Sequence, residues 1–277
     1  MINCPIIALL FLPASFAAPL AACSPLELII GKNFKLFMAK GCSNTTVARG
    51  TTEPRAPSYG IIVGDPLYSA TKRLLPEMTA YSVNYPASFV ADSKIKGATD
   101  TVAHINAQSK ACADQKFVLV GYSQGADVMH EAAAKLDSAL FSRIVALVMF
   151  GDPGNKGPEA LSPLGGKVPV FPADLQTKLK ENCAAQDPVC TNSGKNTSAH
   201  LTYRNGDYMA KSAAYIQKQF QTGGKAGASP SPNGGPNDKG DNTSAMQSLG
   251  KALGATPKQM GDLGKAMKGE SRVKILA

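Results

Sequence analysis

The chain has 277 residues, which is enough for one large domain or two small ones with a buried core. Hydrophobic residues make up 44% of it, as in ordinary globular proteins, and the absence of Trp disfavours a carbohydrate-binding module built on exposed Trp. The net charge is +9, but no Lys/Arg cluster is interleaved with aromatic residues. The composition therefore argues against a nucleic-acid partner and indicates a basic charge that serves solubility.

Residues 1–18 are predicted to be a signal peptide. The apolar run over residues 6–16 is too short to cross a bilayer, and small residues suited to cleavage follow it. No later stretch approaches the roughly 20 apolar residues of a membrane helix. We therefore expect a secreted, extracellular protein without a membrane span. Cys4 would leave with the signal peptide, and an oxidising compartment favours disulfides among the five Cys that remain.

Residues 19–222 are predicted to form one α/β domain. From about residue 23, apolar runs alternate with helical patterns, which is typical of β-α-β units around a parallel sheet. Strands are expected at residues 26–30, 79–85, 117–120 and 144–150, and helices at residues 99–112, 124–136 and 207–220. Residues 223–277 are rich in Gly, Ser and Pro, carry eight Lys/Arg against four Asp/Glu, and are predicted to be a disordered basic tail.

A possible nucleophile lies between the third expected strand and the helix after it. Gly121-Tyr122-Ser123-Gln124-Gly125 matches the pattern Gly-x-Ser-x-Gly. A sharp strand-to-helix turn projects the serine hydroxyl above the sheet edge, and the two Gly let neighbouring backbone approach closely. The N-terminus of the helix then directs N–H groups at a developing oxyanion. This context predicts that Ser123 is a catalytic nucleophile.

Three His could serve as its base. His104 precedes Ser123 inside an expected helix. His130 follows on the next helix, about 10 Å away along the axis at 1.5 Å per residue. His200 lies in a polar loop before the last helix and gives the chain order Ser, acid, His that α/β-hydrolases use. Elimination and order both favour His200.

Two acids compete to orient His200. Asp152 ends an apolar strand, a usual place for such an acid, but it also suits a simple Asp-Pro turn. Asp187 lies inside the loop from Cys183 to Cys190. A disulfide across this loop would stabilise the fold by roughly 2–3 kcal/mol and fix the carboxylate thirteen residues before His200. The residues favour Asp187 and leave Asp152 open.

Four motifs together resemble the cutinase family over residues 23–222. They are Ala48-Arg-Gly-Thr-Thr-Glu53, Gly121-Tyr-Ser-Gln-Gly125, Cys183-x-x-x-Asp187-x-x-Cys190 and Ala199-His-Leu201. The resemblance implies a small lidless α/β-hydrolase with a central five-stranded parallel sheet flanked by helices. It makes Ser123 the nucleophile, His200 the general base and Asp187 the orienting acid, with a Cys183–Cys190 disulfide. It assigns the oxyanion hole to the backbone N–H groups of Thr51 and Gln124, adds the Thr51 hydroxyl as a further donor, and implies no cofactor or metal.

The sequence departs from the family pattern before Ala48. If residues 31–47 are removed, the stretch that begins at Cys23 reads like one uninterrupted family strand. These residues are therefore predicted to be an insertion, such as a translated intron, which transcript reads would test. On this interpretation Cys23 is the better disulfide partner for Cys112, and Cys42 is the odd thiol. The insertion also lies close enough to Thr51 to disturb the oxyanion hole.

The substrate-side residues allow more than one function. The segment 191–199, next to His200, is polar, whereas relatives that bind long acyl chains carry apolar residues there. Leu201, Phe89 and Val90 remain as apolar contacts. We predict a monomeric, secreted carboxylic ester hydrolase of cell-wall degradation, a cutinase that cleaves cutin polyester. The alternatives are an acetylxylan esterase on the same fold and a non-catalytic wall-interaction protein that works through its basic tail.

Overall fold

A single parallel sheet organises the domain. The computed structural model describes residues 43–229 apart from 56 and 91, together with residues 247, 250, 251 and 254–261. Its five strands lie in the order β2-β1-β3-β4-β5, and every pairing is parallel. The strands are β1 (Ser43–Ala48), β2 (Thr79–Ser82), β3 (Lys116–Tyr122), β4 (Ile144–Phe150) and β5 (Leu179–Asn182). The five-stranded parallel sheet implied by the resemblance is confirmed.

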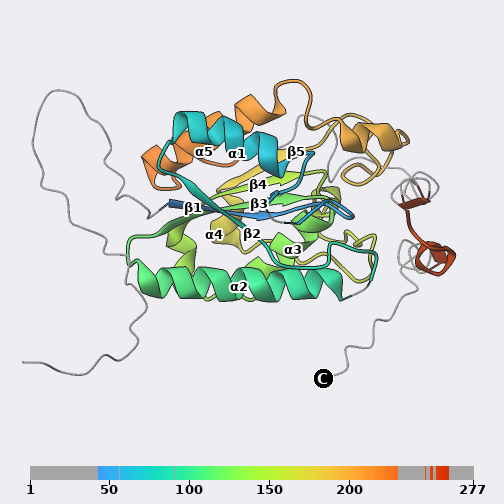
Figure 1. Cartoon of the computed structure of the whole chain (residues 1–277), viewed down its shortest axis with the longest axis horizontal. Coiled ribbons are helices and arrows are strands. Elements are labelled where there is room, and N and C mark those ends of the chain that lie inside the picture. Colours follow the sequence, from blue (N-terminus) through green and yellow to red (C-terminus); the bar gives the residue numbers. More distant parts are fainter. Residues whose placement is uncertain are drawn as a thin grey trace, which may run out of the picture.

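Helices cover both faces of this sheet (Figure 1). One face carries α1 (Gly64–Leu74) and α5 (Tyr208–Thr222), and the other carries α2 (Ser93–Ala111) and α3 (Gln124–Ala133). The short helix α4 (Ala173–Gln176) precedes β5, and the 3-10 turns are Ser138–Arg143, Pro153–Lys156 and Thr197–Leu201. The chain runs outward from β1 to β2 and then crosses back to β3. The loops that leave β1 and β3 therefore diverge, which forms the crevice where open α/β sheets bind ligands.

The strands β3 and β4 were predicted from the sequence because both are buried on both faces of the sheet. Val118 and Val120 face the α1 and α5 side, whereas Phe117 and Leu119 face the α2 and α3 side, and all four are fully buried. Burial on both faces requires a continuous apolar run rather than an alternating one. Such a run is a clear sequence signal, and β4 coincides with the predicted residues 144–150.

The first strand that the structure describes is not the predicted one. The expected strand at residues 26–30 lies outside the described residues, and β1 instead begins at Ser43, within the segment interpreted as an insertion. Because β1 pairs with both β2 and β3, residues 43–47 are an essential part of the sheet. Its polar side chains are satisfied inside the core: the Thr45 hydroxyl lies 2.8 Å from Met78 Sδ, and the Thr46 hydroxyl donates to Asn44 Oδ1 at 3.2 Å.

Three elements, α1, α4 and β5, have no counterpart among the predicted ones. Neither α1 nor the edge strand β5, Leu-Lys-Glu-Asn, carries a long apolar run. The chain after α5 then returns to β5, where Ser229 N donates to Leu179 O at 2.7 Å and Glu181 N donates to Ser229 O at 3.0 Å. Ser229 thus pairs with the sheet edge through an isolated parallel bridge. Most of the expected tail lies outside the described residues, so its disorder stays a prediction.

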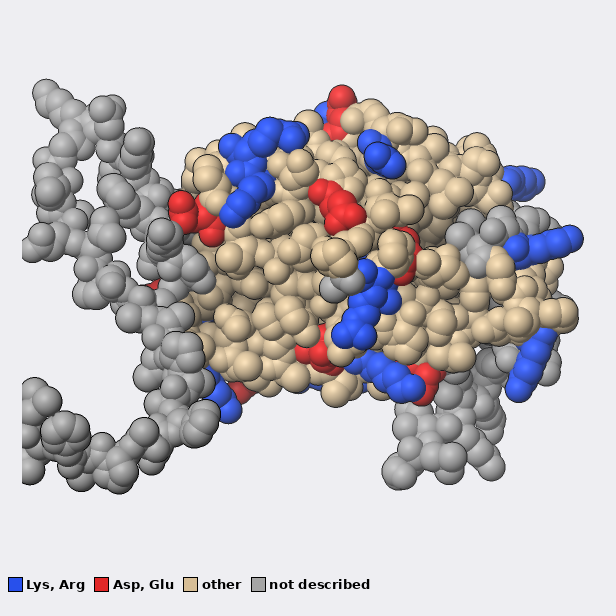
Figure 2. All heavy atoms as spheres, in the orientation of Figure 1, with Lys and Arg blue, Asp and Glu red and all other residues tan. Residues whose placement is uncertain are grey.

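The surface does not present one continuous basic area on the face drawn in Figure 2. There, Lys and Arg side chains are dispersed among acidic and uncharged residues. Within the described part of the chain, no helix has the length and apolar character needed to cross a membrane.

Candidate active site

Ser123 occupies a strained turn between β3 and α3. Its φ is +56°, an uncommon value for a residue with a side chain, and its N–H donates to Phe150 O at 3.0 Å. A Cβ at Gly121 would lie 2.6 Å from the Ala126 Cα, and one at Gly125 would lie 2.0 Å from the Ala48 carbonyl oxygen. Both glycines are therefore required by close backbone contacts, as the Gly-x-Ser-x-Gly pattern indicated.

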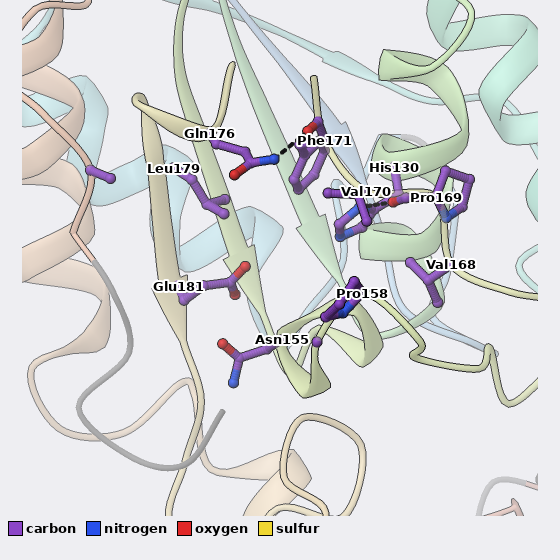
Figure 3. A pocket seen from close by; sticks show the side chains of 13 residues that line it. His130, Asn155, Pro158, Val168, Pro169, Val170, Phe171, Gln176, Leu179 and Glu181 are labelled. Atoms are coloured by element: carbon purple, nitrogen blue, oxygen red, sulfur yellow. Dashed lines mark hydrogen bonds between the residues drawn. The ribbon is translucent and has the colours of Figure 1, made fainter. Parts of the chain in front are cut away.

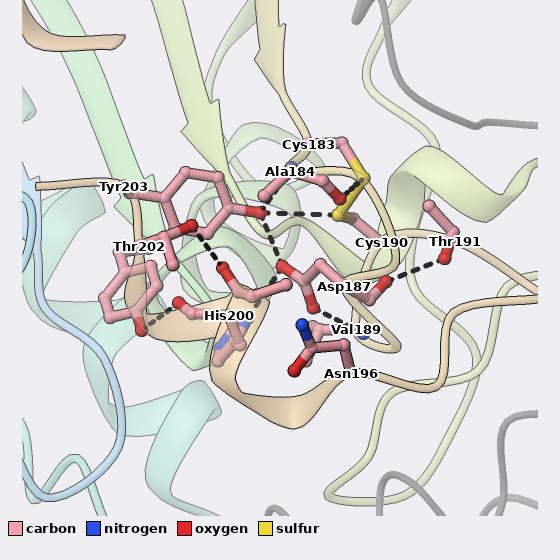
Figure 4. Close-up of polar contacts among 12 residues, drawn as sticks. Cys183, Ala184, Asp187, Val189, Cys190, Thr191, Asn196, His200, Thr202 and Tyr203 are labelled. Carbon is pink, nitrogen blue, oxygen red and sulfur yellow. Dashed lines mark hydrogen bonds and ion pairs between the residues drawn. A yellow bond between two sulfur atoms is a disulfide. The ribbon is translucent and has the colours of Figure 1, made fainter. Parts of the chain in front are cut away.

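His200 is held beside this turn by the residue that precedes the serine. The Tyr122 hydroxyl donates to His200 O at 2.8 Å, and the two rings stack with centroids 5.0 Å apart. His200 Nδ1 lies 2.9 Å from Asp187 Oδ2 (Figure 4). The His200 side chain is only 1% exposed, and its Nε2 has no hydrogen-bond partner among the described residues. One nitrogen is thus engaged by an acid, and the other remains available for a proton.

Asp187 is fixed by several donors at once. Val189 N donates to its Oδ1 at 2.8 Å, and the Tyr203 hydroxyl donates to its Oδ2. The Cys183–Cys190 disulfide closes the loop that carries this acid. Burial alone would raise the pKa of Asp187, but the charge of His200 and these hydrogen bonds outweigh it and lower the pKa. Asp187 is therefore held as a carboxylate.

Ser123 and His200 line a common cavity of about 170 Å³, and Thr51 lines it with them. Apolar side chains complete part of its wall: Ile61, Ile62 and Leu201. Ser123 Oγ and His200 Nε2 do not bond directly in this structure, since Nε2 has no partner. Hydrogen bonds between catalytic groups are often loose without substrate and tighten when it binds. The cavity can hold a small reacting group between a hydroxyl and a free imidazole nitrogen.

The side chain of Gln124 connects the turn to the loop after β1. Its Nε2 donates to Thr51 Oγ1 at 3.2 Å, while its Oε1 accepts from Ser93 Oγ at 2.7 Å. A second donation, from the same Nε2 to Ser88 O at 2.8 Å, fixes the amide further. Gln124, whose backbone N–H is one predicted oxyanion donor, therefore also positions Thr51, the other predicted donor.

Arg49 and Glu53 hold the loop that carries Thr51. The Arg49 guanidinium donates to Glu53 O at 2.8 Å and to Tyr85 O at 2.8 Å. The Glu53 carboxylate accepts from Gly50 N at 2.7 Å and from Ile62 N at 2.8 Å. These contacts explain the Ala-Arg-Gly-Thr-Thr-Glu motif, because its two charged residues fix the turn between them.

A family model described as Cutinase matches residues 41–220. The chain belongs to the cutinase family. The match begins just before β1, so it includes β1 and leaves out the stretch at residues 26–30. This agrees with the sheet pairing and again contradicts an insertion over residues 43–47.

Individual relatives agree with this assignment. A cutinase from Botryotinia fuckeliana is 33% identical over 187 residues, which cover 65% of this chain and 85% of the relative. A Trichoderma reesei cutinase solved with a C11Y4 phosphonate inhibitor has a TM-score of 0.53 at 31% identity, and the match covers 65% of this chain and 76% of that cutinase chain. An acetylxylan esterase structure has a TM-score of 0.53 at 26% identity, and the match covers 65% of this chain and 98% of the esterase chain. The protein is a serine ester hydrolase of the cutinase family.

The rival acid of this cutinase-family chain lies in a different histidine pair. Asp152 Oδ2 is 2.8 Å from His130 Nε2, and both side chains are buried. The remaining nitrogen of His130 lies 2.6 Å from Pro169 O. The structure therefore pairs Asp187, and not Asp152, with His200. The third histidine, His104, stacks on Tyr81 with ring centroids 3.6 Å apart, away from the Ser123 cavity.

The second predicted disulfide is only partly described. Cys112 is disulfide-bonded, but its predicted partner Cys23 and the alternative Cys42 both lie outside the described residues. The preference for Cys23 depended on an insertion over residues 31–47, and β1 removes that support. Peptide mapping without reduction would identify the partner.

Three residues around His200 were not predicted from the sequence. Tyr122 holds its backbone, Tyr203 donates to its partner Asp187, and Gly151 lies against its ring. Each role depends on a contact between distant parts of the chain. The only local signal was Gly151 itself, which ends β4 immediately before Asp152.

A Tyr203→Phe variant tests the support of Asp187. The Tyr203 hydroxyl also accepts from Ala184 N at 3.1 Å, so its loss leaves a buried N–H without a partner. We expect the free energy of unfolding to fall by about 1–3 kcal/mol, and kcat to fall by less than about tenfold because the His200–Asp187 bond persists. Urea unfolding and ester hydrolysis measure both. Tyr68→Phe, on the half-buried surface of α1, is the control, and an equal change there would contradict this role.

Proposed function

We propose that this chain hydrolyses carboxylic esters by acyl transfer through Ser123, His200 and Asp187. Ser123 attacks the ester carbonyl, and His200 takes its proton and returns it to the leaving alcohol. The backbone N–H groups of Gln124 and Thr51 stabilise the oxyanion, with the Thr51 hydroxyl as a further donor. Water then repeats the sequence on the acyl-enzyme.

One observation carries the proposal: a buried carboxylate–imidazole pair lies against the cavity that Ser123 lines, and Nε2 of its imidazole has no hydrogen-bond partner among the described residues. Asp187 fixes the Nδ1 proton, which leaves Nε2 of His200 as the base. The strained φ of Ser123 adds support, since such backbone outliers cluster at active sites.

For the substrate, we propose a cutin-type polyester with apolar acyl chains. Ile61 and Leu201, which line the Ser123 cavity, are 50% and 42% exposed. Val90, an expected apolar contact, is 44% exposed. Large apolar side chains in solvent at the rim of a small cavity favour an acyl chain that lies across the surface. Ile61 was not among the apolar contacts predicted from the sequence.

The second candidate is an acetylxylan esterase. It is favoured by the polar segment 191–199 before His200 and by the similarity to a solved acetylxylan esterase. A cavity of about 170 Å³ would also accommodate an acetyl group without any apolar rim. The two candidates therefore differ in the part of the substrate that contacts Ile61 and Leu201.

A fluorophosphonate probe and an ester series test these proposals. We expect the probe to label the wild-type protein and not Ser123→Ala, whereas no labelling of the folded wild type would favour a non-catalytic wall-interaction protein. Cutin and C4 to C16 esters should then be cleaved faster than acetylated xylan. A marked preference for C2 esters and acetylated xylan would instead establish the second candidate.

We propose that the protein is secreted. One ground is the signal peptide predicted at residues 1–18, which lies outside the described residues. The other is the disulfides, because disulfides persist in oxidising compartments. N-terminal sequencing of the protein from culture medium tests it. A mature protein that still begins at Met1 would contradict the proposal. Monomeric state and absence of a nucleic-acid partner likewise stay predictions.

A further inference from the structure

The pattern Asn-x-Ser/Thr, with a middle residue other than Pro, occurs at Asn44, Asn196 and Asn242. In secreted proteins this pattern is the acceptor for N-linked glycans, and the modified Asn lies at the surface because a glycan is bulky and hydrophilic. Asn242 lies outside the described residues. The places of Asn44 and Asn196 in the fold therefore decide which of these two can carry a glycan.

The sheet excludes Asn44. This residue lies in β1, which pairs with β2 on one side and with β3 on the other, and it is only 7% exposed. Its Nδ2, the atom to which a glycan is attached, donates to Thr79 Oγ1 at 3.4 Å, and its Oδ1 accepts from the Thr46 hydroxyl at 3.2 Å. A glycan on this nitrogen would have to lie inside the packed domain, so the folded protein cannot hold one there.

Asn196 instead lies at the surface, at the start of the 3-10 turn Thr197–Leu201 that carries His200. Ser198, the third residue of the pattern, is exposed as well. The Asn196 Oδ1 accepts from Ser198 N at 3.0 Å and so caps the turn. This hydrogen bond uses the oxygen of the amide and leaves its nitrogen outside the cap. At about 2.0 Å per residue, His200 follows about 8 Å along the turn.

The loop that ends at Asn196 is fixed to the domain at both ends. At its start, Asn155, which Figure 3 labels, donates its amide nitrogen to Cys190 O at 3.0 Å. At its end, Asn196 N donates to Gln186 O at 3.0 Å, and Figure 4 shows Asn196 beside the loop of Asp187. Asn196 is therefore held at the surface next to the catalytic acid and base.

We propose that Asn196 carries an N-linked glycan at the His200 side of the catalytic site. In the transfer, Nδ2 loses a proton and bonds to the anomeric carbon of a lipid-diphosphate-linked oligosaccharide. The bond from that carbon to the diphosphate oxygen breaks, and the lipid diphosphate leaves. Oδ1 keeps its lone pairs, so the cap on the His200 turn persists. The proposal rests on secretion through a eukaryotic endoplasmic reticulum and does not depend on ester hydrolysis.

Glycan mapping on the secreted full chain tests the proposal. A yeast host secretes the chain behind its own signal sequence, so the result does not depend on residues 1–18. Peptide-N-glycosidase in heavy-oxygen water converts a glycosylated Asn into labelled Asp, which mass spectrometry locates. We expect the label at Asn196 and none at Asn44, nor at Asn192, whose sequence Asn-Ser-Gly is not an acceptor. Removal of the glycan from the native wild type should leave kcat for a soluble butyrate ester within about twofold, because the cap persists.

Variants at Ser198 provide the matched pair. Ser198→Ala removes the acceptor hydroxyl but keeps Asn196 and should lose the label, whereas Ser198→Thr restores the pattern and should retain it. An unmodified Asn196 in secreted wild type that still reacts with the fluorophosphonate probe would overturn the proposal and leave ester hydrolysis intact. A label at Asn44, or a label at Asn196 that persists in Ser198→Ala, would overturn it too. The wild-type result stands even if a variant does not fold.

Discussion

Asp187→Asn is expected to lower kcat for a soluble butyrate ester by about 10³–10⁴ while leaving KM within a few-fold. The Asp187 carboxylate accepts from His200 Nδ1 at 2.9 Å and thereby keeps the proton on that nitrogen. An amide can turn its NH₂ toward Nδ1 and stabilise the other tautomer. Nε2 would then carry the proton and could no longer accept one from Ser123.

Asp152→Asn is the matched control, because Asp152 is the other acid that the sequence left open. It lies 2.8 Å from His130 Nε2, so its loss removes the carboxylate that raises the pKa of this buried imidazole. We expect kcat within about threefold of wild type and a free energy of unfolding lower by about 1–3 kcal/mol. Steady-state kinetics and urea unfolding of both variants separate the two roles. An activity loss in Asp152→Asn as large as that in Asp187→Asn would contradict the assignment of the triad.

The sequence predicted the fold best where burial on both faces left a single physical choice. The strand β4 consists of seven consecutive apolar residues, Ile144–Phe150, and its bounds were predicted without error. The strand β1 is just as buried, yet four of its six residues are Ser, Asn or Thr. Their hydroxyls and amide are satisfied by Met78, Thr79 and one another, contacts that no local pattern contains. For this reason the apolar run at residues 26–30, and not β1, was predicted to be the first strand.

The site shows the same division between local and distant signals. The strained turn at Ser123 was predictable because the Gly-x-Ser-x-Gly pattern lies within one strand-turn-helix unit, although the close contact of Gly125 is with Ala48 on β1. The choice between Asp187 and Asp152 was not, because it depends on which histidine each acid meets across the fold. The resemblance resolved that choice through the disulfide loop. The supporting contacts of Tyr122 and Tyr203 join distant parts of the chain and have no local sequence signal.

Gly151→Ala is expected to lower kcat by about 10²-fold or more although residue 151 takes no part in the chemistry. A Cβ there would lie 2.6 Å from His200 Cε1 and 2.8 Å from His200 Nδ1, and both distances are shorter than any normal contact. His200 is buried and bound to Asp187, so the ring must shift away from its position beside Ser123. Displacements of about 1 Å at reacting groups cost roughly this much in rate.

The positive φ of Gly151, +53°, adds a backbone cost to the alanine variant, and Gly223→Ala controls for it. Gly223 has a φ of +63° at the end of α5, but a Cβ there would meet no atom within 4 Å. Both variants should lose about 1–2 kcal/mol of unfolding free energy from the strained conformation. Only Gly151→Ala should also lose activity at a temperature where both are fully folded, because only its methyl group reaches His200. Equal kcat values for the two variants would contradict this prediction. They would show that the reaction does not depend on the position of His200 against Gly151.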